Sequence, residues 1–149
     1  MRLEYDFRIG DRDAGTFVVL DDGAQLQQMV SFQADDGGQY ENRYAVRYLE
    51  GRVTAYQVGE GDWIDCASLP PDHFPTSAYP LLVRSGVNRY VAIDEETGML
   101  SPRELEHLSD RVIERQQGTP IRTFHLRDGV IVRIDWGGAV SSLRTASEA

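Results

Sequence analysis

The sequence contains no lysine, and its 15 basic residues are arginines that occur one at a time from Arg2 to Arg144. Acidic residues number 24, which gives a formal net charge of −9 at pH 7. Nucleic acids and anionic membrane surfaces attract clusters of basic residues, which this sequence lacks. We therefore expect neither as a partner, and we interpret the negative charge as a contribution to solubility.

Cysteine and long apolar runs are also scarce. Cys66 is the single cysteine, so an internal disulfide is excluded. No apolar run approaches the roughly 20 residues of a membrane-spanning helix. The first residues carry charges where a secretory signal requires an apolar stretch. We expect no membrane insertion and a cytoplasmic location.

The sequence has no recognisable cofactor or catalytic motif. His73, His107 and His125 lack metal-ligand spacing, and Cys66 has no cysteine partner. A glycine-rich phosphate loop and a nucleophile elbow are both absent. We predict no metal site, no cofactor and no catalytic residue.

One group of residues leaves an enzymatic alternative open. Asp62, Asp65, Asp72 and His73 surround Trp63 in the sequence. Acid–base catalysis needs two titratable groups close to one reacting atom, and neighbouring positions across a proline-rich loop do not establish that. The same letters are typical of a surface loop. We therefore favour the loop interpretation and keep a small enzyme with an acidic and histidine site as the alternative.

The length and composition predict one domain. The chain has 149 residues, 41% of them hydrophobic, which suffices for one core. We expect a single β-dominated domain over residues 1–149, with a frayed tail at 144–149.

Alternation of apolar and polar residues dominates the first half. Leu3, Tyr5, Phe7 and Ile9 fall on one face of an extended chain, and charged residues fall on the other. Gly and Asp turns separate such segments, which is typical of antiparallel hairpins. The expected strands are 3–9, 16–20, 24–33, 40–48, 53–58, 63–67, 88–93, 121–126, 130–136 and 139–143.

Two segments differ from this pattern. Ser101-Pro102-Arg103-Glu104 has the features of a helix start with a capping box, and the apolar residues Leu105, Leu108 and Val112 follow at helical spacing. We predict a helix over about 102–116. The apolar run 79–83 is too short to separate helix from strand.

Aromatic residues on the expected strands suggest a binding surface. Rings on one face of a curved sheet either fill a core or line a cavity. The hydroxyl groups of Tyr44, Tyr48 and Tyr56 need water or a partner, and the amide of Asn42 has the same need. We predict a ligand site formed by Tyr44, Tyr48, Tyr56, Trp63, Asn42 and Trp136.

Several short motifs carry a resemblance to known proteins. Leu-Glu-Tyr-Asp-Phe-Arg-Ile-Gly at 3–10, Ala-Gly-Thr-Phe at 14–17 and the run of hairpins resemble uncharacterised bacterial half-barrel families. These families are related in fold to the lipoprotein-localisation-factor superfamily and to glycolipid-binding proteins. The resemblance implies a bent antiparallel sheet wrapped partly round a helix, with a concave face that can hold acyl chains. The missing export signal argues against a lipoprotein-carrier role.

Together these observations predict a mainly β protein. We expect a curved antiparallel meander of about 9–11 strands that forms a half-barrel, with helix 102–116 on its concave face. The predicted function is non-enzymatic binding of a small apolar or amphiphilic, lipid-like ligand. A protein–protein module, such as a homodimer formed through an exposed sheet edge, is a further alternative.

Overall fold

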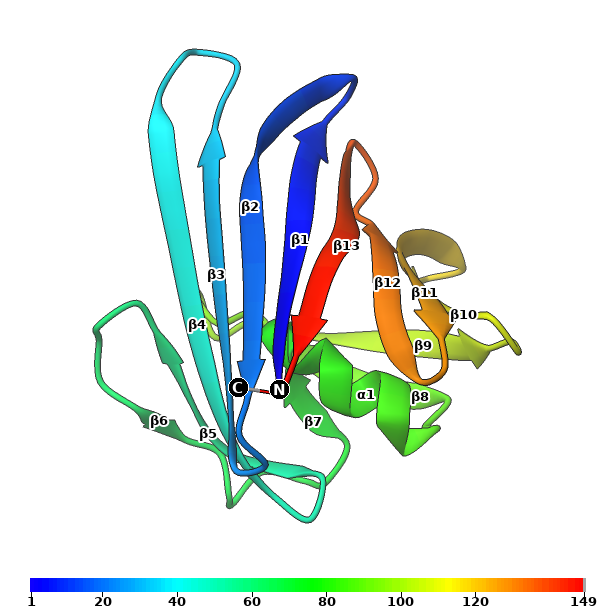
Figure 1. The fold of residues 1–149 in the computed structure, drawn as a ribbon. Coiled ribbons are helices and arrows are strands. Elements are labelled where there is room, and N and C mark those ends of the chain that lie inside the picture. Colours follow the sequence, from blue (N-terminus) through cyan, green and yellow to red (C-terminus); the bar gives the residue numbers. More distant parts are fainter. Residues whose placement is uncertain (149) are drawn as a thin grey trace.

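The chain begins in the middle of a curled sheet, runs outward to one edge, and then returns from the other edge to the middle, so that β13 lies beside β1 (Figure 1). The computed structural model describes residues 1–148. From β1, one set of neighbours runs through β2, β3, β4 and β5 to β6; the other runs through β13, β12, β11, β10, β9 and β8 to β7. All neighbours pair antiparallel except β7 and β8, which are parallel.

The first-half strands are β1 (Arg2–Ile9), β2 (Arg12–Asp21), β3 (Gln25–Gln33), β4 (Gln39–Leu49), β5 (Arg52–Val58) and β6 (Ile64–Asp65). The others are β7 (His73–Pro75), β8 (Arg89–Ile93), β9 (Leu100–His107), β10 (Arg111–Gln116), β11 (Thr119–Arg127), β12 (Val130–Asp135) and β13 (Ala139–Ser147).

The connection between the two edge strands requires the sheet to curl. β6 and β7 lie at opposite ends of the 13-strand order, and only residues 66–72 join them. A flat sheet of this width would separate its edges by roughly 58 Å, at about 4.8 Å between neighbouring strands. The linker reaches at most roughly 28 Å when fully extended. The sheet therefore bends into an open half-barrel, which confirms the predicted fold class.

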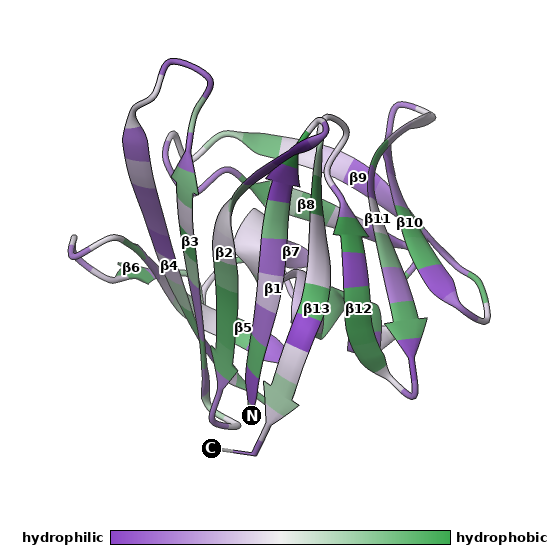
Figure 2. Ribbon diagram, turned by 45° about the horizontal axis from the view of Figure 1, so that its top comes forward, coloured by the Kyte–Doolittle hydropathy of each residue, from purple (hydrophilic) through white to green (hydrophobic). Residues whose placement is uncertain are grey.

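Alternation along the strands determines which side chains face the concave side. Tyr5 is almost fully buried, while its neighbour Asp6 is exposed. Figure 2 shows the same alternation as hydrophobic and hydrophilic bands along β1. In β2, Phe17 and Val19 are buried in the matching register. The concave side is therefore the apolar side, as the period-two pattern predicts.

A short helical segment plugs the concave side. It consists of the 3-10 helix η1 (Thr76–Ala78) and α1 (Tyr79–Ser85), which connect β7 to β8. Pro80 suits the first turn of α1, and Gly86 ends it in the left-handed conformation that glycine adopts without strain. Tyr79, Leu81 and Leu82 are buried against the sheet. The segment that the sequence left undecided is therefore the helix.

The predicted helix at 102–116 is wrong, because this segment forms the hairpin of β9 and β10. Leu105 and Val112 face the core, as do the half-buried Arg103 and the fully buried Glu114. Polar residues at core positions obscured the period of two and left a spacing that imitates a helix. The two strands also join without glycine or proline, so only Ser109 and Asp110 mark the turn.

Aromatic rings and α1 fill the centre of the half-barrel. Tyr79 stacks on Phe124 with 5.1 Å between ring centroids and meets the edge of Trp136 at 5.8 Å. Trp136 packs against Phe17, which in turn packs against Tyr5. These contacts join α1 to strands from both halves of the chain. The centre of the concave side is therefore core rather than cavity.

Two other predictions concern the ends of the chain and the edges of the sheet. The predicted frayed tail is wrong for residues 144–147, which belong to β13 and pair with the start of β1. Residue 149 lies outside the described residues. The edge strands β6 and β7 have only two and three residues. Homodimerisation through an edge stays a prediction.

Candidate functional site

The η1 end of the plug is held by buried polar groups. The buried carboxylate of Glu95 accepts hydrogen bonds from the backbone N–H of Ser77 at 2.9 Å and from the N–H and hydroxyl of Thr76. The Gln28 side chain donates to the carbonyl oxygen of Ser77. Arg122 donates to the carbonyl oxygen of Thr76 at 2.9 Å. Groups from β3, β11 and the loop after β8 thus fix this end of the plug.

Arg122 is itself part of a buried ionic network. Its guanidinium donates to the fully buried carboxylate of Glu114, which also accepts hydrogen bonds from Tyr90 and from Arg103. Burial by itself raises the pKa of Glu114, but the charge and hydrogen bonds of Arg122, with the Tyr90 hydroxyl, outweigh it and lower that pKa. Burial raises the pKa of Tyr90 to about 12. Glu114 is therefore charged at neutral pH, and its partners satisfy it.

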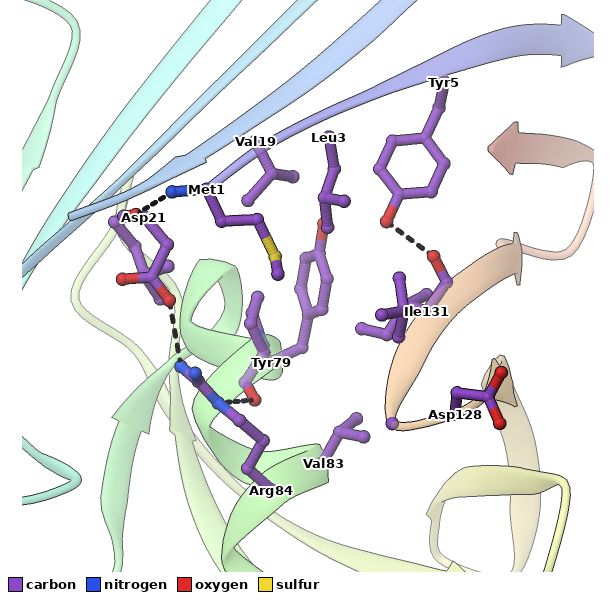
Figure 3. A pocket seen from close by; sticks show the side chains of 14 residues that line it. Met1, Leu3, Tyr5, Val19, Asp21, Tyr79, Val83, Arg84, Asp128 and Ile131 are labelled. Carbon is purple, nitrogen blue, oxygen red and sulfur yellow. Dashed lines mark hydrogen bonds and ion pairs between the residues drawn. The ribbon is translucent and has the colours of Figure 1, made fainter. Parts of the chain in front are cut away.

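A pocket of about 290 Å³ lies beside α1, at the end of the half-barrel where the first strand begins. Figure 3 shows Leu3 and Val19 above it, Ile131 to one side, and Tyr79 and Val83 of α1 below. The pocket is open to solvent on one side, and its lining is mostly apolar. The full lining is Met1, Leu3, Tyr5, Val19, Asp21, Leu26, Tyr79, Pro80, Val83, Arg84, Asp128, Gly129, Val130 and Ile131.

Two tyrosine hydroxyls at the pocket differ in their partners. The Tyr5 hydroxyl donates to the carbonyl oxygen of Ile131 at 2.7 Å, and burial raises its pKa. The Tyr79 hydroxyl is buried and has no hydrogen-bond partner within residues 1–148. Burial raises the Tyr79 pKa well above its ordinary value, so the phenol is neutral. Both groups therefore present uncharged rings to the pocket.

An ion pair lies at the rim of the pocket. Nη2 of Arg84, on α1, is 3.2 Å from Oδ2 of Asp21, at the end of β2. Asp21 also accepts hydrogen bonds from the Tyr48 hydroxyl at 2.6 Å and from the backbone N–H of Gly23 at 2.9 Å. Arg84 is half-exposed, whereas Asp21 is mostly covered. The opening is thus apolar apart from this ion pair on one side and Asp128 on the other.

The residues of the predicted ligand site are not brought together. Tyr56 is core, and half-buried Trp136 donates to the Ser141 hydroxyl at 3.0 Å. Trp63 lies 3.7 Å beneath the guanidinium of Arg47. Asn42 is exposed. The Tyr44 hydroxyl donates to Glu96, and burial raises the pKa of Tyr44 to about 12. The Tyr48 hydroxyl donates to Asp21 at the rim of the pocket.

The acidic group around Trp63 is also dispersed. His73 pairs with its neighbour Asp72 at 2.8 Å, and Asp65 accepts a hydrogen bond from the backbone of Ala67. Within residues 1–148, no hydrogen bond or ion pair joins Asp62 or Asp65 to the Asp72–His73 pair. None of these residues lines a pocket that we describe. The arrangement offers no convergent acid–base site.

The sequence did contain one signal for the pocket. Pro80 and Gly86 bracket the apolar run 79–83 as a helix start and a helix stop. This short helix packs its buried residues against the concave side of the sheet. The strand residues Leu3, Val19 and Ile131 carry no separate signal, because each also fits an ordinary core position.

Among residues 1–148, no group of His, Cys, Asp and Glu is arranged to hold a metal ion. The same residues include no helix with the length and apolar character needed to cross a membrane. Comparisons with models of protein families, with curated proteins and with solved structures found no match.

Proposed function

We propose that this protein binds a small apolar or amphiphilic ligand in the pocket beside α1 and does not catalyse a reaction. The observation that carries the proposal is the apolar opening left between α1 and β1, β2 and β12, beside the packed aromatic core. Its volume of about 290 Å³ lies at the lower end of the roughly 300–1,000 Å³ typical of ligand sites. An alkyl chain entering it would remove apolar surface of both molecules from water.

Position also supports the proposal. Tyr5 and Tyr79 close the inner end, and their rings belong to the packed aromatic core. The charged pair of Arg84 and Asp21 lies at the outer rim. A molecule with an apolar chain and a polar head fits this gradient, with the chain inside and the head at the mouth.

The test is calorimetric titration with 1-octanol and with octanoate. Val83 is half-buried on the pocket side of α1, so Val83→Trp fills the pocket while leaving the core intact. We expect saturable binding of at least one probe to the natural protein and at least about tenfold weaker binding to V83W. The matched control is Val58→Trp on β5, another half-buried valine, which lies outside the pocket lining.

Each outcome has a definite meaning once thermal unfolding shows that both variants are folded. Binding to V58W that equals binding to the natural protein, with binding to V83W lost, supports the proposal. No saturable binding of either probe to the natural protein overturns it. Equal binding to V83W and to the natural protein also overturns it, because the ligand would then occupy another place.

A further inference from the structure

Arg84 borders both the pocket and a second apolar opening. The second opening has a volume of about 280 Å³ and is lined by Tyr48, Gly51, Leu81, Arg84 and Ser85. Arg84 contributes to both linings, and its side chain crosses from α1 to Asp21 (Figure 3). One flexible side chain thus borders two apolar spaces beside α1.

The contacts that hold Arg84 are few and weak. Its Nη2 pairs with Asp21 at 3.2 Å, and its Nε donates to the carbonyl oxygen of Pro80 at 3.2 Å. The side chain is 52% exposed, and ion pairs this open contribute little to stability. Arg84 can therefore exchange its partner at little cost.

Asp21 stays satisfied when Arg84 leaves it. The Tyr48 hydroxyl at 2.6 Å and the Gly23 N–H at 2.9 Å both donate to its Oδ1, whereas Arg84 donates to its Oδ2. Breaking an ion pair is costly mainly where it leaves a buried charge without partners. That condition does not apply here, so the pair is suited to opening.

From this geometry we infer that the ligand is a carboxylate-bearing amphiphile, whose head replaces Asp21 as the partner of Arg84 while its chain occupies the apolar pocket. This inference rests on the proposed function. A guanidinium presents two parallel N–H donors that match a carboxylate, so the exchange replaces the single contact to Asp21 with a two-point contact.

The surrounding charges explain why an anionic head has to replace Asp21 as the partner of Arg84. Asp21 and Asp128 both line the pocket, and the protein is acidic overall with a formal charge of −9. The acidic groups would repel an anion that merely approached the rim. Direct contact with Arg84 is therefore what makes its binding favourable. A cationic head would instead meet Asp21, whose carboxylate already accepts three hydrogen bonds. Asp128 lies on the opposite side of the pocket from Arg84 (Figure 3).

The test compares three probes with the same chain: octanoate, 1-octanol and octylammonium. We expect the natural protein to bind octanoate about tenfold more tightly than 1-octanol. Arg84→Gln should abolish this preference, and Arg84→Lys should restore part of it. Asp21→Asn keeps an oxygen for Tyr48 and Gly23 but removes the competing charge, so it should strengthen octanoate binding about threefold.

The control is Arg43→Gln, because Arg43 is also a 52% exposed arginine in an ion pair but does not line either opening. It should bind all three probes as the natural protein does. Equal affinity for octanoate and 1-octanol overturns the carboxylate inference and leaves the proposed function standing, as does a preference for octylammonium. Binding of none of the probes overturns both.

Discussion

The two ends of the plug, η1 and α1, are held by opposite kinds of contact. At η1, Glu95, Gln28 and Arg122 hold the backbone through buried hydrogen bonds, and Glu114 neutralises Arg122. At the end of α1, a half-exposed arginine makes one ion pair, and an apolar pocket is left open. The contrast indicates that the first end specifies the structure, while the second has freedom to respond to a ligand.

Removing the charge of Glu114 should give the largest effect. Glu114→Gln leaves Arg122 buried beside a neutral partner, and breaking a buried ion pair costs about 3–5 kcal/mol. Urea denaturation measures the change in the free energy of unfolding. The control is Glu106→Gln on the same hairpin, where an exposed pair with Arg115 should change it by at most about 0.5 kcal/mol. Equal effects of the two substitutions would remove the contrast between the buried and the exposed ion pair.

The pH dependence of unfolding should identify the same carboxylate. The pKa of Glu114 is lower in the folded protein than its ordinary value of 4.5, so the unfolded chain binds the proton more readily. Its stabilising contribution is complete above that value and is lost as the pH falls through the folded pKa. The difference in stability between the natural protein and E114Q should therefore shrink as the pH falls below 4.5. A constant difference from pH 7 to pH 3 would contradict the charged state of Glu114.

An intermediate effect is expected at Glu95, which binds η1 directly. Glu95→Gln replaces one acceptor oxygen with a donor that faces the N–H groups of Thr76 and Ser77. Hydrogen bonds to charged groups contribute about 1.5–3 kcal/mol, so we expect a loss of that size in urea denaturation. The neighbouring exposed Glu96 provides the control, because E96Q disturbs only the contact with Tyr44. A loss in E96Q as large as in E95Q would be inconsistent with a specific role of Glu95.

The smallest effect on stability is expected at the other end of the plug. Arg84→Gln should change the free energy of unfolding by no more than about 1 kcal/mol, because its ion pair is half-exposed. Amide hydrogen exchange should show the difference within the plug: protection of the last turn of α1 falls in R84Q, while that of η1 is unchanged. A uniform loss of protection across 76–85 would show that the two ends respond as one unit.

The sequence predicted the sheet better than it predicted the plug or the site. Period-two alternation identified β1 and β4 because each has a polar face in solvent. It failed at β9 and β10, where Arg103 and Glu114 occupy core-facing positions and meet their partners across neighbouring strands. A buried ion pair looks like two exposed residues until its partners are known.

The pocket could not be read from the sequence for a related reason. Its lining joins Leu3, Val19, Val83 and Ile131 from four different elements, and each alone resembles a core residue. The aromatic residues that suggested a ligand site were conspicuous, but Tyr56 packs in the core and Trp136 packs at its border. A space between elements depends on how the elements pack. Residue types alone do not predict that packing.

The most direct test of ligand binding beside α1 is a methyl NMR titration of the natural protein with octanoate. The methyl signals of Leu3, Val19, Val83, Val130 and Ile131, which line the pocket, should shift along one saturation curve. Those of Leu105 and Val112, on the β9–β10 hairpin, should stay unchanged. Pocket methyl signals that do not move at saturating octanoate, or shifts spread evenly over both groups, would contradict binding at this pocket.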